Sequence, residues 1–150
     1  MERPFQSDIV PIRLVFVCVE NANRSQMAQA FARMLGGQRI EAHSAGSRPS
    51  GVVNPRAIEA MKELGYDLTS HRSTGLDELP DVSFTMAVTM GCGDVCPQIR
   101  ARLHEDWALP DPKDLPPDDF RQVRDTIRDK VADLLTRLDM AIDKGSEENR

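Results

Sequence analysis

The sequence predicts a single α/β domain with a mainly parallel sheet. Its length of 150 residues suits one domain, and 40% apolar and 29% charged residues are ordinary values for a globular protein. Apolar segments of strand length alternate with segments that favour helices, which is the pattern of α/β folds. A chain of this length buries about two-thirds of its unfolded surface. We therefore expect residues 1–150 to fold as one domain without a stabilising disulfide or metal.

The first half of the chain begins this alternation. Residues 12–17, IRLVFV, form a continuous apolar run, typical of a strand that is buried on both faces. Residues 25–35 favour a helix, with Ser25 as its N-terminal cap and Gly36–Gly37 at its end. A second strand is predicted over residues 39–45. The order of these elements is therefore strand, loop, helix, strand.

The second half continues in the same way. Pro55 suits the first position of a helix that runs to about Leu64 and ends before a glycine. Residues 82–90 are a further strand candidate. Residues 109–119 contain four prolines, which predicts a loop. The longest helix is expected from Pro117 to about Asp143.

This last helix is amphipathic. Its apolar positions advance by three and four residues and form one face: Phe120, Val123, Ile127, Val131, Leu134, Leu138 and Ile142. Its arginines alternate with aspartates, which predicts a solvated, ion-paired opposite face made by Arg121, Arg124, Arg128, Asp125 and Asp129. At the two ends of the chain, residues 1–10 are predicted to be a loose leader and residues 144–150 a frayed polar tail.

Charge and hydropathy exclude several classes of protein. The net charge is −5, whereas nucleic-acid-binding modules are typically basic. No run approaches the roughly 20 apolar residues that span a bilayer, and the N-terminus lacks the pattern of a signal peptide. We expect a cytoplasmic protein with neither a nucleic-acid nor a membrane partner. Residues 1–40 nevertheless hold five arginines against three acidic residues, which suggests an anion site there.

The loop after the first strand has the composition of an oxyanion site. Cys18 and Arg24 have the spacing Cys-x5-Arg, and the loop opens into the first helix. Backbone N–H groups and the helix dipole in such a loop attract an anion, and the planar guanidinium holds two oxygens. The same field favours the nucleophilic thiolate of Cys18, to which Ser25 can donate a hydrogen bond. The predicted oxyanion-binding residues are Val19, Glu20, Asn21, Ala22, Asn23, Arg24 and Ser25.

A second match to this spacing has a different context. Cys96 and Arg102 are also separated by five residues, but Pro97 follows the cysteine at once. The segment contains no glycine or asparagine, and no helix opens after Arg102. We predict the start of a helix there and no second anion site.

The three cysteines Cys18, Cys92 and Cys96 are an odd number, which favours thiol chemistry over a disulfide framework. Cys92 and Cys96 lie in the segment GCGDVCP after the third predicted strand, where the glycines supply backbone freedom. The pair can be unreactive, or it can bind zinc together with His43, His71 or His104. The x3 spacing without a second Cys or His pair suits zinc poorly. We expect no metal and no cofactor.

The segment VFVCVENANRSQMAQAFA resembles the active-site segment of the low-molecular-weight tyrosine phosphatase family, and more closely that of arsenate reductases built on the same fold. The resemblance continues through the motifs SAG, NPRAIEAMKELG and DWALPDP and covers most of residues 12–138. It implies a four-stranded parallel sheet flanked by helices, with a phosphatase-type P-loop after the first strand.

The resemblance also implies a reaction. Cys18 attacks the arsenic of arsenate, and Asp111 of the Asp-Pro pair protonates the leaving oxygen. Cys92 then forms a disulfide with Cys18 and releases arsenite, and Cys96 moves the disulfide to Cys92–Cys96. Thioredoxin, or another thiol reductant such as glutathione or mycothiol, regenerates the enzyme. Lys113 follows Asp-Pro where phosphotyrosine phosphatases typically carry a tyrosine, which favours a small inorganic oxyanion.

Two other functions remain open at the level of sequence. The same Cys18 loop can hydrolyse phosphotyrosine or another phosphomonoester through a phosphoenzyme, and it can bind an oxyanion without catalysis. Gln29 stands where many family members carry an acid, which argues against a potassium site, and we expect it at a solvated helix position. Asn21 is predicted to fix the loop, and His43 and His71 to be structural.

Overall fold

The computed structural model describes residues 11–91 and 99–148, with side chains as far as Asp139. Its centre is a four-stranded sheet in the order β2-β1-β3-β4, and every neighbouring pair is parallel. The strands are β1 (Ile12–Cys18), β2 (Ile40–Gly46), β3 (Phe84–Thr89) and β4 (Ala101–Asp106). The predicted single α/β domain with a four-stranded parallel sheet is therefore confirmed.

Strand β1 lies at the centre of the sheet because both of its faces are apolar. It pairs with β2 from Ile12 to Cys18 on one side and with β3 from Leu14 to Val17 on the other. Phe16 and its neighbours have almost no exposed surface. Cys18, the last residue of β1, is consequently placed at the carboxyl edge of the sheet, where ligands bind in open parallel sheets.

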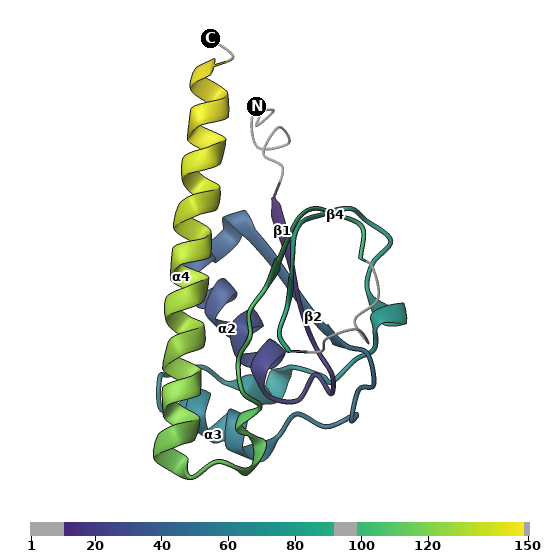
Figure 1. Ribbon diagram of the computed structural model, residues 1–150, viewed down its shortest axis with the longest axis vertical. Helices are drawn as coiled ribbons and strands as arrows, with labels where there is room; N and C mark the ends of the chain where they lie inside the picture. Colours follow the sequence, from purple (N-terminus) through teal and green to yellow (C-terminus); the bar gives the residue numbers. More distant parts are fainter. Residues whose placement is uncertain (1–10, 92–98, 149–150) are drawn as a thin grey trace, which may run out of the picture.

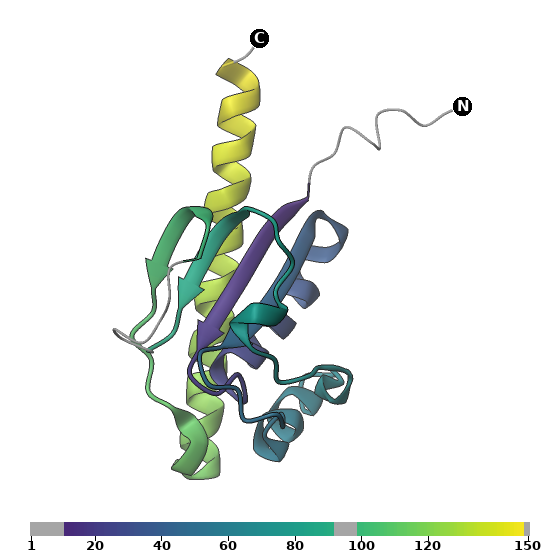
Figure 2. The same ribbon diagram turned by 90° about the vertical axis from the view of Figure 1, so that its right-hand side faces the viewer.

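The three α-helices are α2 (Arg24–Gly36), α3 (Pro55–Lys62) and α4 (Pro117–Glu148). Helices α2 and α4 lie side by side over one face of the sheet, and α3 lies below α2, next to the N-terminal part of α4 (Figures 1 and 2). The main core forms between these helices and that face, from Phe16 of β1, Met27 and Phe31 of α2, and the apolar stripe of α4. The amphipathic pattern predicted for the last helix is confirmed from Phe120 to Leu138.

The opposite face of the sheet has a thinner cover. The segment around the 3-10 turn Leu76–Glu78 packs there, and Figure 2 shows this turn on the side of the sheet away from α4. A small second core forms between Val15, Val17 and Phe84 of the sheet and Leu76 and Leu79 of this segment. Both faces of β1 are therefore buried, as its continuous apolar sequence predicts.

One strand and one helix end differ most from the sequence prediction, and the other elements agree within about two residues. Residues 101–106 form the edge strand β4, so the helix start predicted over residues 96–102 is wrong for the part that the structure describes. Most side chains of β4 are exposed, and backbone bonds to β3 stabilise it without an apolar pattern. Helix α4 continues to Glu148, beyond the predicted end at Asp143, because adding residues to an existing helix needs no new nucleation.

Arg124 corrects the expectation for the polar face of α4. Its side chain is buried and donates from Nη1 to Ala60 O at 2.9 Å and to Glu63 Oε1 at 2.7 Å. Arg121 also pairs with Glu63, and it remains partly exposed. The arginine face of α4 is therefore partly a contact with α3.

Within the described ranges, every helix is too short or too polar to cross a membrane.

Candidate active site

The oxyanion loop, residues 18–25, connects β1 to α2, and its carbonyl groups are turned away from its centre. Backbone N–H groups of the segment 47–54 bind them from outside. The bonds are Ser47 N to Cys18 O at 3.2 Å, Arg48 N to Val19 O at 2.8 Å, Ser50 N to Glu20 O at 3.0 Å and Asn54 N to Ala22 O at 3.1 Å. In the part of the chain that the structure describes, the N–H groups of residues 20–24 have no acceptor. Such N–H groups at a helix N-terminus form an anion-binding cradle.

The Cys18 thiol lies inside this cradle, buried, with a hydrogen-bond donor beside it. Its Sγ is 2.9 Å from Ser25 Oγ, and Asn21 Nδ2 donates to the same hydroxyl at 2.7 Å. Because the hydroxyl accepts from Asn21, its own hydrogen is free to point at the sulfur, which stabilises a thiolate. Ser25 was expected to cap α2, but the helix begins at Arg24 with Asn23 as its cap residue. The expected hydrogen bond between Ser25 and Cys18 is present.

Asn21 fixes the shape of the oxyanion loop. It is fully buried, and its φ of 52° lies in the left-handed region, which asparagine tolerates better than most residues. Its Oδ1 accepts from Gln26 Nε2 at 3.0 Å and from Thr74 N at 2.9 Å. One side chain thus joins the loop, the first turn of α2 and the segment before the turn at Leu76–Glu78.

His71 supports the loop from a second layer. Its Nδ1 is 2.9 Å from Gln26 Oε1, and its Nε2 is 2.6 Å from the hydroxyl of Tyr66. Gln26 uses its own amide hydrogens on Asn21, so the Nδ1 of His71 carries a hydrogen. Burial lowers the pKa of His71 to about 4, and the nearby positive charge of Arg33 adds to this effect. His71 is therefore neutral at physiological pH, a structural placement that matches the expectation.

Arg24 extends from the first turn of α2 across the mouth of the cradle, and its side chain is buried. Its Nη1 donates to Leu109 O at 3.1 Å, and its Nη2 is 3.9 Å from Asp111 Oδ2. Gly91 makes room for the guanidinium, because a Cβ on this residue would lie 2.6 Å from Arg24 Nη1. Gly91 also has a φ of 82°, so a side chain there is disfavoured twice.

Asp111 belongs to the acid loop, residues 109–115, which faces the oxyanion loop. Its Oδ1 accepts from Lys113 N at 3.1 Å and caps the 3-10 turn Pro112–Asp114. Lys113 Nζ in turn is 3.8 Å from Glu20 Oε2 across the mouth. The pocket between the two loops is lined by Cys18, Glu20, Ala22, Asn23, Arg24 and Asp111.

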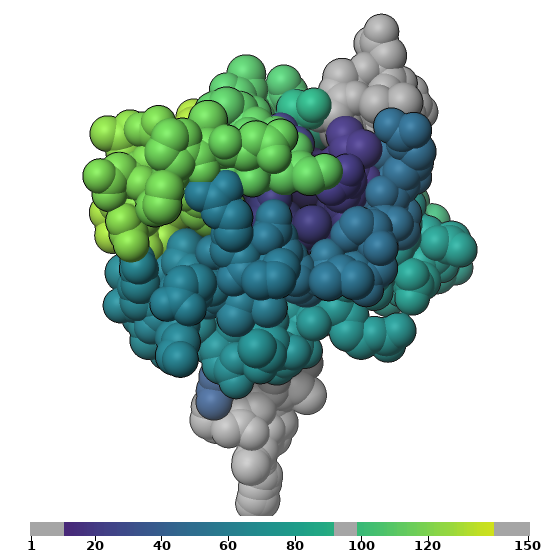
Figure 3. Space-filling view, turned by 90° about the horizontal axis from the view of Figure 1, so that it is seen from below, coloured from purple at the N-terminus to yellow at the C-terminus, as the bar shows by residue number. Residues whose placement is uncertain are grey.

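Figure 3 shows this region from below. The purple surface of the segment after β1 lies in a hollow between the green surface of the segment before α4 and the blue surface of the segment before α3. Residues far apart in the sequence thus meet at one accessible pocket. The structure brings Cys18, Arg24 and Asp111 together there, as the sequence predicts.

Gln29 corrects a further expectation, because it is buried and not solvated. Its Nε2 donates to Ala42 O at 3.0 Å, and its Oε1 accepts from Ser44 Oγ at 2.6 Å. Both ends of the neutral amide are thereby occupied by groups of β2. Among the described residues, no cluster of His, Cys, Asp and Glu is arranged to hold a metal ion.

Cys92 and Cys96 lie outside the described residues, so their predicted relay and the zinc alternative remain predictions. Two of the histidines considered for zinc have other partners. His43 Nε2 is 2.8 Å from Glu41 Oε2, and His71 belongs to the network behind the oxyanion loop. The described chain reaches Gly91, next to Cys92, and Gly91 contacts Arg24 of the cradle. The supporting roles of Gln26 and Thr74 were missed by sequence reasoning, because no spacing rule links these positions to Asn21.

The fold and the Cys-x5-Arg cradle define a class of protein. The family model of the low molecular weight phosphotyrosine protein phosphatase matches residues 13–144, and the chain belongs to this family. Within it, the chain is 35% identical over 128 residues to an arsenate reductase of Staphylococcus aureus, a match of 83% of this chain and 96% of that protein. An arsenate reductase 2 of Staphylococcus haemolyticus has the same identity and coverage.

Solved structures give the same picture. A structure of an arsenate reductase in the phosphate binding state is similar with a TM-score of 0.77 and 33% identity, over 83% of this chain and 97% of the other. A thioredoxin-dependent arsenate reductase of Corynebacterium glutamicum is similar with a TM-score of 0.73 and 27% identity, over 91% of this chain and 67% of the other. The predicted resemblance to this family is confirmed.

Proposed function

We propose that this protein is an enzyme that reduces arsenate to arsenite with its own thiols. The observation that carries the proposal is the buried Cys18 thiol, 2.9 Å from the Ser25 hydroxyl, in a cradle that also contains Arg24 and faces Asp111. Similarity to arsenate reductases along most of the chain supports arsenate as the substrate. The reaction needs no metal and no cofactor.

Binding of the substrate follows from the geometry of the oxyanion loop. The free N–H groups of residues 20–24 and the N-terminus of α2 attract a tetrahedral dianion, and the fork of Arg24 holds two of its oxygens. Val19, Glu20, Asn21, Ala22, Asn23, Arg24 and Ser25 are the proposed oxyanion-binding residues. Arsenate and phosphate have the same shape and charge, so the cradle accepts both.

The first step is nucleophilic attack. The Cys18 thiolate forms a bond to arsenic, and one oxygen of arsenate leaves as water. That oxygen needs a proton, which Asp111 supplies from the acid loop on the other side of the pocket. Ser25 stabilises the sulfur anion before the attack through its hydrogen bond. The product of the step is an arsenic(V) adduct on Cys18.

The second step transfers two electrons. Cys92 attacks Cys18, the sulfur–arsenic bond breaks, and its electron pair remains on arsenic, which leaves as arsenite. The two thiols lose two electrons and form the Cys18–Cys92 disulfide. Cys96 then attacks Cys92 by thiol–disulfide exchange, which frees Cys18 and leaves a Cys92–Cys96 disulfide. Gly91, which has a φ of 82° and leaves room for Arg24, directly precedes Cys92 in the sequence.

An external thiol reductant completes the cycle. The similarity to a thioredoxin-dependent arsenate reductase supports thioredoxin, and a low-molecular-weight thiol is the alternative. The relay requires its three cysteines to be reduced between cycles, which supports a cytoplasmic location.

Phosphomonoester hydrolysis is a second candidate, favoured by the family model, whose description is a phosphotyrosine phosphatase. The same attack by Cys18 on phosphorus, followed by water, releases phosphate and needs neither Cys92 nor Cys96. The exposed Lys113 stands in the acid loop next to the Asp-Pro pair, where an aromatic residue would be needed to pack against a phosphotyrosine ring. This favours a small inorganic substrate.

Arsenite release with a thioredoxin system distinguishes the two functions. Wild type is expected to reduce arsenate, and the variants Cys92→Ser and Cys96→Ser are expected to lose catalytic turnover while still binding phosphate. Arsenate reduction by both variants at the wild-type rate would contradict the relay. Rapid hydrolysis of p-nitrophenyl phosphate without any arsenate reduction would favour the phosphatase.

A further inference from the structure

We propose that Arg56, in the first turn of α3, is a positioning residue that holds the acid loop over the oxyanion loop. This inference rests on the proposed role of Asp111 as the proton donor. Arg56 lies in the NPRAIEAMKELG motif, and it does not line the pocket between the two loops. Its side chain points instead at the outer side of the acid loop.

The guanidinium of Arg56 binds two carbonyl groups of that loop. Its Nη1 donates to Lys113 O at 2.7 Å, and its Nη2 donates to Leu115 O. Lys113 in turn donates its backbone N–H to Asp111 Oδ1 at 3.1 Å. A single residue, Lys113, therefore connects the arginine to the carboxylate that is to deliver the proton.

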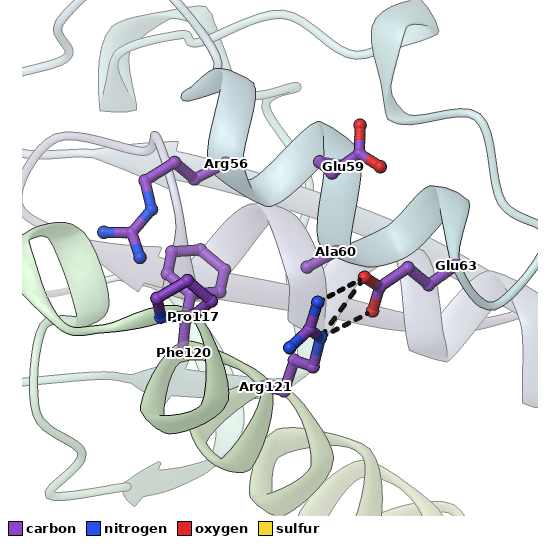
Figure 4. A pocket seen from close by; sticks show the side chains of 7 residues that line it. All are labelled: Arg56, Glu59, Ala60, Glu63, Pro117, Phe120 and Arg121. Carbon is purple, nitrogen blue, oxygen red and sulfur yellow. Dashed lines mark hydrogen bonds and ion pairs between the residues drawn. The ribbon is translucent and has the colours of Figure 1, made fainter.

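Phe120 also restricts the side chain of Arg56. Its Cζ lies 4.9 Å from the centre of the Phe120 ring, a cation–π contact that restricts the side chain. Figure 4 shows the guanidinium over this ring, on the α3 side of a pocket that α3 and α4 form. Arg56 is half-buried, and its bond to Leu115 O is partly shielded from water, whereas its bond to Lys113 O is exposed.

The turn that carries Arg56 is also joined to the oxyanion loop. Asn54 donates from its backbone N to Ala22 O at 3.1 Å, and its side-chain Oδ1 accepts from Arg56 N at 2.9 Å. The start of α3 thus touches both loops and sets the distance between them. Arg24 holds the other end of the acid loop through its bond to Leu109 O at 3.1 Å. Two arginines therefore hold the acid loop on either side of Asp111.

This arrangement predicts a specific loss when Arg56 is removed. In Arg56→Ala the acid loop keeps its bond to Arg24 but loses the two bonds from Arg56 to Lys113 O and Leu115 O. The carboxyl of Asp111 is therefore displaced from the leaving oxygen. Small displacements of catalytic groups have large kinetic effects, and we expect the first turnover to slow by about 10- to 100-fold. The oxyanion loop is untouched, so the dissociation constant for phosphate should change by less than about twofold, as expected for a residue outside the binding site.

The experiment compares wild type with Arg56→Ala, Arg56→Lys and the control Arg121→Ala. Arg121 lines the same pocket from α4 but binds Glu63 and Asp118 and does not contact the acid loop (Figure 4). Each change is made in the wild-type and in the Asp111→Asn background. The readouts are single-turnover arsenite formation, phosphate binding and hydrogen exchange at the amides of Lys113 and Leu115.

Four results support the inference together. Arg56→Ala slows the first turnover in the wild-type background and has no further effect in Asp111→Asn, since both changes remove the same proton transfer. Exchange at Lys113 and Leu115 becomes faster in Arg56→Ala. Arg56→Lys recovers part of the rate, because an ammonium group replaces the charge but not the fork. Arg121→Ala leaves both the rate and the exchange as in wild type.

Results that contradict the role of Arg56 can be told apart from results that contradict the proposed function. Equal slowing by Arg56→Ala in both backgrounds, or unchanged exchange in the acid loop, overturns the positioning role and leaves the proposed function intact. If Asp111→Asn itself turns over as fast as wild type, the acid assignment fails and the inference fails with it. A loss of phosphate affinity in Arg56→Ala of the same size as the loss in rate assigns the residue to binding, which also overturns the inference.

Discussion

The oxyanion loop and the acid loop face the same pocket, but the chain holds them in different ways. From Asn21 onward the oxyanion loop is buried, and it is held by hydrogen bonds that start inside the domain at Gln26, His71 and Thr74. In the acid loop Pro112 is the one buried residue, and the loop is held by two arginine side chains of other segments, Arg24 and Arg56.

The difference matches what each loop has to do. A cradle for a dianion must be rigid before the substrate arrives, because its stabilising N–H groups then need no reorganisation during the reaction. A proton donor must exchange protons with water between cycles, which requires an exposed carboxyl. The comparison therefore predicts that changes in the acid loop alter the rate alone, while changes in the oxyanion loop alter stability as well.

Asp111→Asn is expected to show the largest effect, and only on the rate. General acid catalysis contributes about 10²- to 10⁴-fold, so single-turnover arsenite formation should slow by about that factor. The carboxyl is 47% exposed, and asparagine can still accept the hydrogen bond from Lys113. The free energy of unfolding in urea should therefore change by less than about 0.5 kcal/mol. A loss of stability without a loss of rate would contradict the expectation that changes in the acid loop affect the rate alone.

Asn21→Ala is the matched change in the oxyanion loop, and it should lower the free energy of unfolding. The substitution removes the acceptor of two hydrogen bonds and the donor to Ser25, and it places alanine at a φ of 52°; two of these bonds are buried and the one from Thr74 N is part-buried. We expect a loss of about 3 kcal/mol in the free energy of unfolding. Asn21→Gly separates the contributions and should recover about 1 kcal/mol, because glycine adopts positive φ without strain. Urea unfolding of both variants tests this, and an unchanged Asn21→Ala would contradict it.

The pH dependence of stability tests the second layer of the oxyanion loop. His71 has a pKa of about 4 in the folded protein, since burial disfavours its charged form, against about 6.5 when unfolded. Between these two pH values a proton binds His71 in the unfolded chain but not in the folded protein. The contribution of neutral His71 to stability is therefore complete above pH 6.5 and is lost as the pH falls toward 4. Because solvent screens a half-buried group, we expect about 1 kcal/mol between pH 6.5 and 5.

Urea unfolding at several pH values measures this effect, with His71→Asn as the control. The variant has no titrating group at this position, so its stability should vary less over the same pH interval. An identical pH dependence of wild type and variant would show that His71 is not the neutral support that the structure indicates.

The smallest effect is expected at the mouth of the pocket, where the two loops meet in one exposed ion pair. Glu20 and Lys113 are 3.8 Å apart, and exposed pairs of this kind are worth roughly 0–1 kcal/mol. Glu20→Gln removes a negative charge beside the anion site and should raise kcat/KM for arsenate by about twofold at low salt, while Lys113→Gln should lower it by a similar factor. Both differences should disappear at high ionic strength. Shifts in the same direction would contradict this electrostatic account.

Local sequence predicted the elements that are locally determined. The apolar run of β1, the Cys18-to-Arg24 spacing and the stripe of α4 each lie within one short window, and the structure confirms them. Strand β4 was missed because its side chains are mostly exposed and polar, and its pairing with β3 depends on residues that are distant in sequence.

The supports of the site were harder to predict than its chemistry. Gln29 and Arg124 have the composition of solvated helix positions, and both are buried because carbonyl or carboxylate groups of other elements lie opposite them. The bonds from Arg56 to the acid loop join residues 57 and 59 positions apart. No periodicity in the sequence reports such contacts, although the motif that contains Arg56 is visible.

Counting free thiols after a single turnover is the most direct test of the proposed thiol relay. The fully reduced protein, with three cysteines per chain, is incubated with excess arsenate and no reductant, then unfolded and titrated for free thiols. We expect one arsenite per chain, one remaining thiol at Cys18 and a Cys92–Cys96 disulfide. Three remaining thiols and no arsenite, with p-nitrophenyl phosphate still hydrolysed, would contradict it.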